Sequence, residues 1–324
     1  MKVVSTDFIF KDSNIEMETF AKEGIEWVKS NSLDLEELKK ICKDADGIIT
    51  TYGDINKELI DSLGNCKVIV RTGMGVNNID IDAATQRGII VANVRDYCND
   101  EVSDQALAFI MALVRKVPYI DKTVREKNRW TVQDARPIQR ISDMVVCLLG
   151  FGAISKALSK KLKVIGFKVF AYDPYVDASV FEDWGVERIK DLDAIYPIAD
   201  VLSVHLPLTK ETKDTVTMKQ MKMMKSSAYI INVARGGLVN EKDLYIALKD
   251  KIIAGAALDV LEDEHPDLSK EPLAQLDNIL LSPHIGYYSE GSELALQRGA
   301  IEQAILALKT GKPKYFVNEK ELKK

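Results

Sequence analysis

Short apolar runs alternate with amphipathic stretches along the whole chain. In its first part the runs lie at residues 3–5, 25–28, 47–50, 68–71 and 89–92. The stretches between them, such as residues 33–42, space leucine and isoleucine at helical intervals. Strands that alternate with helices form a parallel sheet, so residues 1–98 are predicted to be one small α/β domain.

A second series of the same kind begins at residue 145. Apolar runs at 145–149, 169–172, 201–204, 228–232, 254–257 and 279–281 predict six more strands, with helices between them. Six alternating strands are typical of a doubly wound, nucleotide-binding sheet. A long helix is expected from Ser289 to Lys309, with Gly311 as its C-cap and Pro313 as a stop.

Between the two series, Asn99 is expected to cap a helix whose first turn carries Asp100 and Glu101. Residues 106–114 (ALAFIMALV) are apolar on every side of this helix, which predicts burial all round. We interpret the helix as the element that joins two domains and as a candidate subunit interface. A central core helix in a monomer is the alternative.

The most informative stretch is the first strand–turn–helix–strand unit of the second series. The first strand runs into Gly150-Phe151-Gly152, a helix starts at Ala153 and Ile154, and the next strand ends on Asp173, 23 residues after Gly150. Such a turn can present backbone N–H groups to a pyrophosphate, and the aspartate can accept the ribose hydroxyls of NAD. The third glycine of the fingerprint is replaced by Ser155, so a simple strand-to-helix turn is the alternative.

Composition and charge restrict the class of protein. The chain has 324 residues, enough for two domains, and its 46% apolar and 29% charged residues are ordinary for a globular protein. A net charge of −5 gives no sign of a nucleic-acid surface, and no apolar run is long enough to span a membrane. The N-terminus resembles a strand rather than a signal peptide, and the four cysteines lack metal-ligand spacing. We therefore expect a cytoplasmic protein with reduced thiols and no metal site.

Candidate chemistry lies after three of the later strands, where ligands bind in an open parallel sheet. Arg235 comes directly after a strand and before Gly236 and Gly237, so its planar guanidinium can bind a carboxylate next to a carbonyl. A structural salt bridge is the other interpretation of Arg235. His284 in SPHIG is the best placed proton donor, whereas His205 is expected to line the cofactor cleft; a structural role for either histidine stays open.

Several spaced motifs together carry a resemblance over nearly the whole chain. VRTGMGVNNIDIDAA, GFGAIS with Asp173, HLPLT, NVARGGLVNEKDL, AALDVLEDE and SPHIG occur in the order and spacing of the D-isomer-specific 2-hydroxyacid dehydrogenases. Within that family the chain looks most similar to the branch of the C-terminal binding proteins. The resemblance implies two α/β domains. A flavodoxin-like substrate domain would be built from residues 1–98 with 291–324, and a Rossmann NAD-binding domain from residues 99–290, through which a homodimer would form.

The resemblance also implies roles for individual residues. Arg235, Glu264 and His284 would be the catalytic three, although Glu262 lies two residues from Glu264 and the chemistry of the loop does not separate them. The substrate would be bound by the residues Arg71, Met74, Gly75 and Tyr287. The cofactor NAD would be bound by Gly150, Gly152, Ala153, Ile154, Asp173, Leu206, Pro207, Thr209, Val233, Ala234 and Asp259.

The expected activity is therefore hydride transfer between a nicotinamide and a small 2-keto acid or D-2-hydroxy acid. A 3-phosphoglycerate dehydrogenase and a hydroxypyruvate or glyoxylate reductase are the alternatives within the family. A non-catalytic NADH-sensing binding protein, like the corepressors, is the alternative outside enzymes. Which 2-hydroxy acid is the substrate does not follow from the residues.

Overall fold

The computed structural model describes residues 1–30 and 32–322, which form two compact units. The first unit contains residues 1–98 and 289–324, and the second contains residues 99–288. The chain enters the first unit for the second time at Ser289, which caps the last long helix, rather than at residue 291. Among the described residues, every helix is too short or too polar to cross a lipid bilayer.

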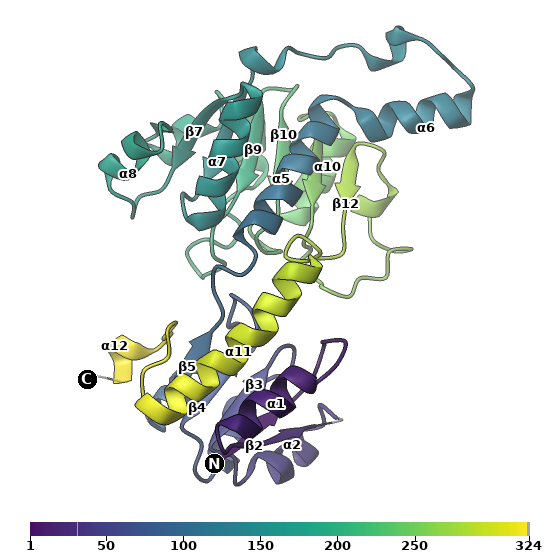
Figure 1. Cartoon of the computed structure of the whole chain (residues 1–324). Helices are drawn as coiled ribbons and strands as arrows, with labels where there is room; N and C mark the ends of the chain where they lie inside the picture. Colours follow the sequence, from purple (N-terminus) through teal and green to yellow (C-terminus); the bar gives the residue numbers. More distant parts are fainter. Residues whose placement is uncertain (31, 323–324) are drawn as a thin grey trace. The chain divides into compact units, whose positions relative to one another are not determined.

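The sheet of the first unit is parallel and has five strands in the order β2-β1-β3-β4-β5 (Figure 1). The strands are β1 (Lys2–Ser5), β2 (Glu26–Lys29), β3 (Gly47–Thr50), β4 (Val68–Arg71) and β5 (Ile90–Asn93). Each was expected from an apolar run, with ends that differ by a residue at most. The order places the loops after β1 and β3 at the point where the strand order reverses.

Helices cover both faces of this sheet because side chains of successive strand residues point to opposite faces. Helices α2 (Leu35–Cys42), α3 (Lys57–Ser62) and α4 (Ile81–Gln86) pack on the face that carries Val4, Ile48 and Ile69. Helices α1 (Asn14–Lys22) and α11 (Glu290–Thr310) pack on the other face. Ser289 caps α11 and Gly311, with a positive φ of 70°, ends it, as the sequence predicts.

The second unit is a parallel sheet of seven strands in the order β12-β11-β10-β9-β6-β7-β8. Six correspond to the predicted runs: β6 (Val145–Leu149), β7 (Lys168–Tyr172), β9 (Val201–Val204), β10 (Tyr229–Asn232), β11 (Gly255–Leu258) and β12 (Ile279–Leu281). The prediction of six strands missed β8 (Glu187–Arg188), a two-residue edge strand that is too short and too charged to form an apolar run.

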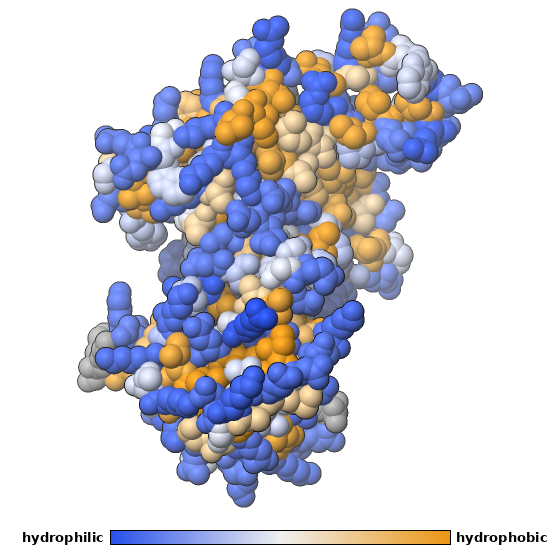
Figure 2. Space-filling model, viewed as in Figure 1, coloured by the Kyte–Doolittle hydropathy of each residue, from blue (hydrophilic) through white to orange (hydrophobic). Residues whose placement is uncertain are grey.

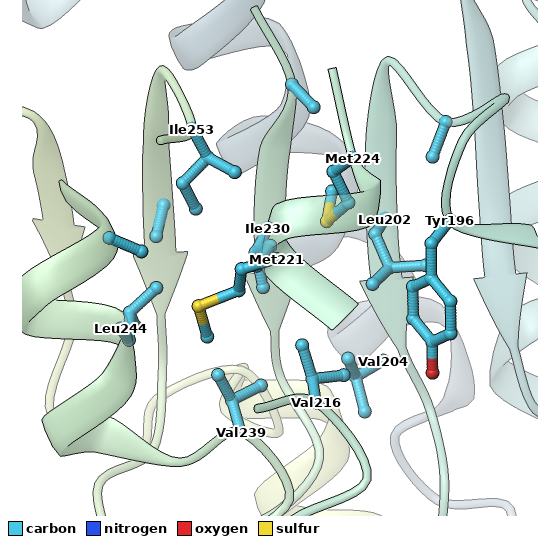
Figure 3. Close-up of a cluster of buried hydrophobic side chains, with 14 of the residues drawn as sticks. Tyr196, Leu202, Val204, Val216, Met221, Met224, Ile230, Val239, Leu244 and Ile253 are labelled. Atoms are coloured by element: carbon cyan, nitrogen blue, oxygen red, sulfur yellow. The ribbon is translucent and has the colours of Figure 1, made fainter. Parts of the chain in front are cut away.

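Two layers of helices cover this sheet as well. The alternate strand residues Leu202, Val204 and Ile230 pack against α9 (Met218–Met223) and α10 (Glu241–Lys249) in a buried cluster (Figure 3). Helices α5 (Asn99–Val114) and α7 (Ala153–Ile165) pack against each other and on the other face of the sheet (Figure 1). The remaining elements of this unit are α6 (Val117–Lys127), α8 (Ala178–Asp183) and short 3-10 turns at Val132–Ala135, Ile141–Asp143, Leu192–Ile195 and Leu273–Gln275. A last short helix, α12 (Glu319–Leu322), belongs to the first unit.

Helix α5 corrects one expectation. It was predicted to be buried all round, but within one chain its burial is confined to one face, which carries Val102, Ala106, Phe109, Ile110 and Leu113. Ala108 is exposed, and Leu107, Met111 and Ala112 are half-buried. The helix thus keeps an apolar face that one chain leaves uncovered.

Candidate active site

The glycine turn between β6 and α7 is held in one conformation by three contacts. Gly150 has a φ of 90°, and a Cβ there would lie 2.7 Å from the carbonyl oxygen of His205, so no other residue fits. The Phe151 N–H donates to Asp173 Oδ2 over 2.9 Å, which ties the turn to the end of β7. The hydroxyl of Ser155 donates to the Gly150 carbonyl over 2.7 Å. Serine in place of the third glycine therefore adds a hydrogen bond across the turn.

The same turn leaves room where a phosphate would be expected. Gly152 is the N-cap of α7, no side chain caps this helix end, and an ideal Cβ on Gly152 would meet no atom within 4 Å. The first turn of α7, which includes Ala153 and Ile154, thus starts next to open space. A helix N-terminus with its positive dipole end suits an anion. These residues fit a dinucleotide pyrophosphate.

Asp173 is half-buried at the end of β7. Its Oδ2 accepts from Phe151 N–H, and its Oδ1 accepts from Tyr175 N–H over 2.9 Å. A carboxylate offers about four lone-pair sites, so the two amides leave capacity for ribose hydroxyls.

His205 and the loop after it contribute to the shape of this region. Burial lowers the pKa of His205 to about 4, so its imidazole is neutral at pH 7 and is not a proton donor there. Its Nε2 lies 2.8 Å from Ser203 Oγ. In the loop that follows, Leu206 is half-buried, while Pro207 and Thr209 are exposed. The hydroxyl of Thr212 donates to the Pro207 carbonyl over 2.5 Å and so closes the loop.

Arg235 is presented by a tight turn after β10. Asn232, the buried last residue of the strand, donates from Nδ2 to the Arg235 carbonyl over 2.8 Å and accepts from Ala234 N–H over 3.0 Å. Val233 is buried beneath the turn, and the guanidinium of Arg235 is half-buried with Nη1 donating to the Ala234 carbonyl. Asn232 was not among the expected site residues, although a polar residue that closes a buried strand is a usable signal.

Glu264 and His284 lie in contact although they come after different strands. His284 Nδ1 is 2.8 Å from Glu264 Oε2, and 37% and 46% of their side chains remain exposed. The hydrogen bond from His284 is the main reason why the pKa of Glu264 is lowered, and the charges of His284 and Arg235 act in the same direction. The ring of Tyr287 lies edge-on to His284, with centroids 6.1 Å apart.

This geometry separates the two glutamates that the chemistry of the loop did not separate, and it agrees with the resemblance, which implies Glu264. The carboxylate of Glu262 lies 3.1 Å from Lys213 Nζ instead of at the histidine. Glu264 is therefore the residue that orients His284 in this structure.

The loop that carries His284 is built on a buried carboxylate. Asp259 is only 1% exposed; its Oδ1 accepts from Ile285 N–H over 3.0 Å and from the Ser282 hydroxyl, and its Oδ2 accepts from Gly286 N–H over 2.8 Å. The His284 N–H donates to the Asp259 carbonyl over 2.7 Å, and His284 has a positive φ of 52°. Burial raises the pKa of Asp259, and these donors partly offset that effect. Asp259 thus holds the backbone of the histidine loop, and its implied role in binding NAD stays a prediction.

Gln105 on α5 extends this network. Its Nε2 donates to Ser282 Oγ over 3.2 Å, so the chain of hydrogen bonds runs from α5 through Ser282 to Asp259. Neither Gln105 nor Ser282 was among the expected site residues. The signal for Gln105 was a polar residue at the start of an otherwise apolar stretch.

The expected substrate residues Arg71, Met74 and Gly75 belong to the first unit, at the end of β4 and in the loop after it. The guanidinium of Arg71 lies across Gly73, so closely that a Cβ on Gly73 would overlap it. The Met74 carbonyl accepts from Asn93 Nδ2 over 2.6 Å, which fixes the glycine loop to the end of β5. The fourth expected substrate residue, Tyr287, belongs to the second unit.

Comparisons with known proteins identify the family of the chain. Residues 107–286 match the family model described as D-isomer specific 2-hydroxyacid dehydrogenase, NAD binding domain. The D-3-phosphoglycerate dehydrogenase of Methanocaldococcus jannaschii is 34% identical over 94% of this chain, which covers 56% of that protein. The glyoxylate reductase of Thermofilum pendens is 33% identical, with coverage of 89% of this chain and 86% of the relative.

The fold agrees as well. The crystal structure of D-lactate dehydrogenase from Aquifex aeolicus, complexed with NAD and lactic acid, superposes with a TM-score of 0.83. It is 25% identical and covers 98% of this chain and 99% of its own. The chain spans about half the length of the two curated phosphoglycerate dehydrogenases that it matches.

Proposed function

Because the chain belongs to the D-isomer specific 2-hydroxyacid dehydrogenase family, we propose that it is an NAD(H)-dependent oxidoreductase that interconverts a small 2-keto acid and its D-2-hydroxy acid. The observation that carries the proposal is the 2.8 Å contact between His284 Nδ1 and Glu264, on a strand-end loop of the same sheet that presents Arg235 and the glycine turn. A proton donor, a cation and a nucleotide turn at one edge of a sheet suit hydride transfer to a carbonyl.

The residues that would hold the cofactor are those of the turn and its surroundings. The first amides of α7 after Gly152 would bind the pyrophosphate, and Asp173 would accept the ribose hydroxyls. The loop from Leu206 to Thr209, with Val233 and Ala234, would line the rest of the cleft. NADH, when bound, supplies the hydride that reduces the keto carbon.

The residues of the chain would handle the charge and the proton. Negative charge develops on the carbonyl oxygen during reduction, and the guanidinium of Arg235 would stabilise it while binding the adjacent carboxylate. Because His284 Nδ1 faces Glu264, the other ring nitrogen, Nε2, would deliver the proton to that oxygen. Glu264 would hold the imidazole in this orientation, and Arg71, Met74, Gly75 and Tyr287 would bind the substrate.

The test is NADH consumption with a panel of 2-keto acids. Pyruvate, 4-methyl-2-oxopentanoate, phenylpyruvate, hydroxypyruvate and glyoxylate would be assayed with the wild type and with His284→Ala, which retains the cofactor site. We expect turnover of at least one acid by the wild type alone. Turnover that never exceeds that of His284→Ala would refute the proposal.

The panel should also contain 3-phosphohydroxypyruvate, because one relative is named a D-3-phosphoglycerate dehydrogenase and another a glyoxylate reductase. A preference for the phosphorylated acid would assign the first activity, and a preference for glyoxylate or hydroxypyruvate the second.

We further propose a homodimer built through the second unit. Helix α6 and the residues after it expose the apolar side chains of Val117, Tyr119, Trp130 and Val132, with Trp130 92% exposed, and Figure 2 shows apolar side chains among charged ones in this region. A groove of about 840 Å³ lies beside α6, between Lys116 and Tyr119 on one side and the amino ends of β10, β11 and β12 on the other. Helix α6 of a second copy, with the residues after it, would cover the groove and the uncovered apolar face of α5. Sedimentation of Trp130→Ser should show a shift towards monomer.

The cytoplasmic localisation stays a prediction, with which the four free cysteines agree.

A further inference from the structure

The segment that carries Glu264 has little packing of its own. Glu262, Asp263 and Glu264 are all exposed, on a loop between β11 and the 3-10 turn at Leu273–Gln275. The hydrogen bond between Glu264 and His284 therefore depends on whatever fixes the backbone of this loop. Three contacts hold this backbone, and they differ in how strongly they restrain it.

The first contact is between backbones. An ideal Cβ on Gly236 would lie 2.1 Å from the Leu261 carbonyl oxygen and 2.4 Å from Glu262 N, so the turn after Arg235 touches the Glu264 loop directly. This contact sets how close the two loops come. It does not by itself prevent the loop from sliding or lifting.

The second contact is the ion pair between Lys213 and Glu262. Both side chains are more than half exposed, so this pair contributes little.

The third contact is a hydrogen bond to the loop backbone. Glu241 Oε1 accepts from Glu262 N–H over 2.5 Å. Glu241 is the first residue of α10, directly after the cap Asn240, whose own side chain accepts from Asp243 N–H. Glu241 is half-buried, and burial raises the pKa of its carboxyl, while the hydrogen bond from Glu262 N–H acts in the opposite direction. A hydrogen bond to a carboxylate is stronger than a neutral one.

We propose that Glu241 is a positioning residue for the reaction: by holding the Glu262 amide it keeps Glu264 within hydrogen-bond distance of His284. This inference rests on the proposed function of Glu264 and His284. Glu241 reaches no reacting atom itself, because its bond is to the backbone two residues before Glu264.

A purely structural role makes a different prediction. An acidic residue in the first turn of a helix stabilises the helix through its charge, and glutamine does not replace that effect. Holding the Glu262 amide needs only an oxygen acceptor, which glutamine retains. Glu241→Gln should therefore rescue catalysis, whereas Glu241→Ala should not.

The experiment compares four variants with the wild type on the best substrate of the panel. Glu241→Ala should lower kcat by about tenfold, which corresponds to roughly 1.4 kcal/mol, with the KM for NADH unchanged. Glu241→Gln should stay within about threefold of the wild type. Glu264→Gln is the positive control. The matched negative control is Glu37→Ala, another first-turn glutamate, on α2 in the first unit. In Glu241→Ala the acid limb of kcat/KM should also move to higher pH, because Glu264 loses the contact that lowers its pKa.

Hydrogen exchange provides a measurement that does not depend on turnover. The peptide that contains Leu261 to Glu264 should exchange faster in Glu241→Ala than in Glu241→Gln. If the wild type turns over no acid of the panel but the peptide still exchanges faster in Glu241→Ala, the enzyme assignment is refuted. The role of Glu241 in holding the Glu262 amide would then still be supported. Wild-type kcat and pH profile in Glu241→Ala, or equal losses in the alanine and glutamine variants, would overturn the positioning role.

Discussion

Replacing Gly236 with alanine should damage catalysis without removing the cofactor. Gly236 is the residue after Arg235, and its backbone lies against the Leu261–Glu262 peptide, which leads to Glu264. A methyl group at this position would meet backbone atoms, which cannot rotate away as the end of a side chain can. Arg235 and Glu264 would therefore be pushed apart by one added carbon atom.

The added Cβ would lie 2.1 Å from the Leu261 carbonyl oxygen, whereas real Cβ contacts essentially never fall below 3.0 Å, so the loops must separate by about 1 Å. A displacement of about 1 Å at a catalytic group costs roughly 100-fold in rate. The overpacking itself should destabilise the fold by about 1–3 kcal/mol.

Steady-state kinetics with NADH and the preferred 2-keto acid would measure the effect, together with a thermal unfolding curve. We expect kcat to fall by roughly 100-fold while the dissociation constant of NADH stays within a few fold, because the glycine turn lies after another strand. Gly291→Ala is the matched control, since a Cβ there meets nothing closer than 3.7 Å. A Gly236→Ala enzyme with kcat within twofold of the wild type would refute the clash argument.

Other predictions concern the cofactor turn and the acid–base pair. Ser155→Gly loses a single neutral hydrogen bond, worth about 1 kcal/mol, and should leave NADH affinity within a few fold. Gly152→Val places a branched side chain in the open space at the start of α7 and should abolish NADH binding. Fluorescence titration with NADH measures both affinities, and equal affinities of the two variants would contradict the assignment of the turn. Asp173→Ala loses the acceptor of two backbone amides and the proposed acceptor of the ribose hydroxyls. NADH affinity should therefore fall roughly ten- to hundredfold, and discrimination against NADPH should shrink. Efficient use of NADPH by the wild type would argue against this role. The pKa of Glu264 is lowered in the folded state, so its contribution to stability is present above the ordinary glutamate pKa and is lost as pH falls through the lowered value. The difference in melting temperature between the wild type and Glu264→Gln should be small, because the group is half exposed, and it should shrink towards acid pH. A difference that grows in acid would contradict the direction of the pKa shift.

Local patterns were enough to predict the secondary-structure elements and the glycine turn. Within residues 1–30 and 32–322, apolar runs located eleven of the twelve strands, because buried parallel strands are apolar without interruption. Ser289 and Gly311 marked the ends of α11 because caps depend on residues next to the helix. Gly150, Gly152 and Asp173 could be recognised together because their spacing along one strand, turn, helix and strand is set by the local chain.

The contact between Glu264 and His284 could not be located from the local chain. The chemistry of the loop does not separate Glu262 from Glu264, and only the family resemblance favours Glu264. The path of the loop after β11 places Glu264 at His284 and Glu262 at Lys213. That path depends on Gly236 and Glu241, which come from a different strand and helix. Sequence periodicity carries no information on such contacts.

The sequence by itself thus determined the two α/β sheets, the glycine turn with its aspartate, and the set of residues from which a dehydrogenase site can be built. Only the tertiary structure showed that Glu264 contacts His284, that Asp259 is buried beneath the histidine loop, and that α5 leaves an apolar face uncovered. The physical reason is that secondary structure depends on interactions within a few residues, whereas loop positions and burial depend on packing between segments far apart in the chain.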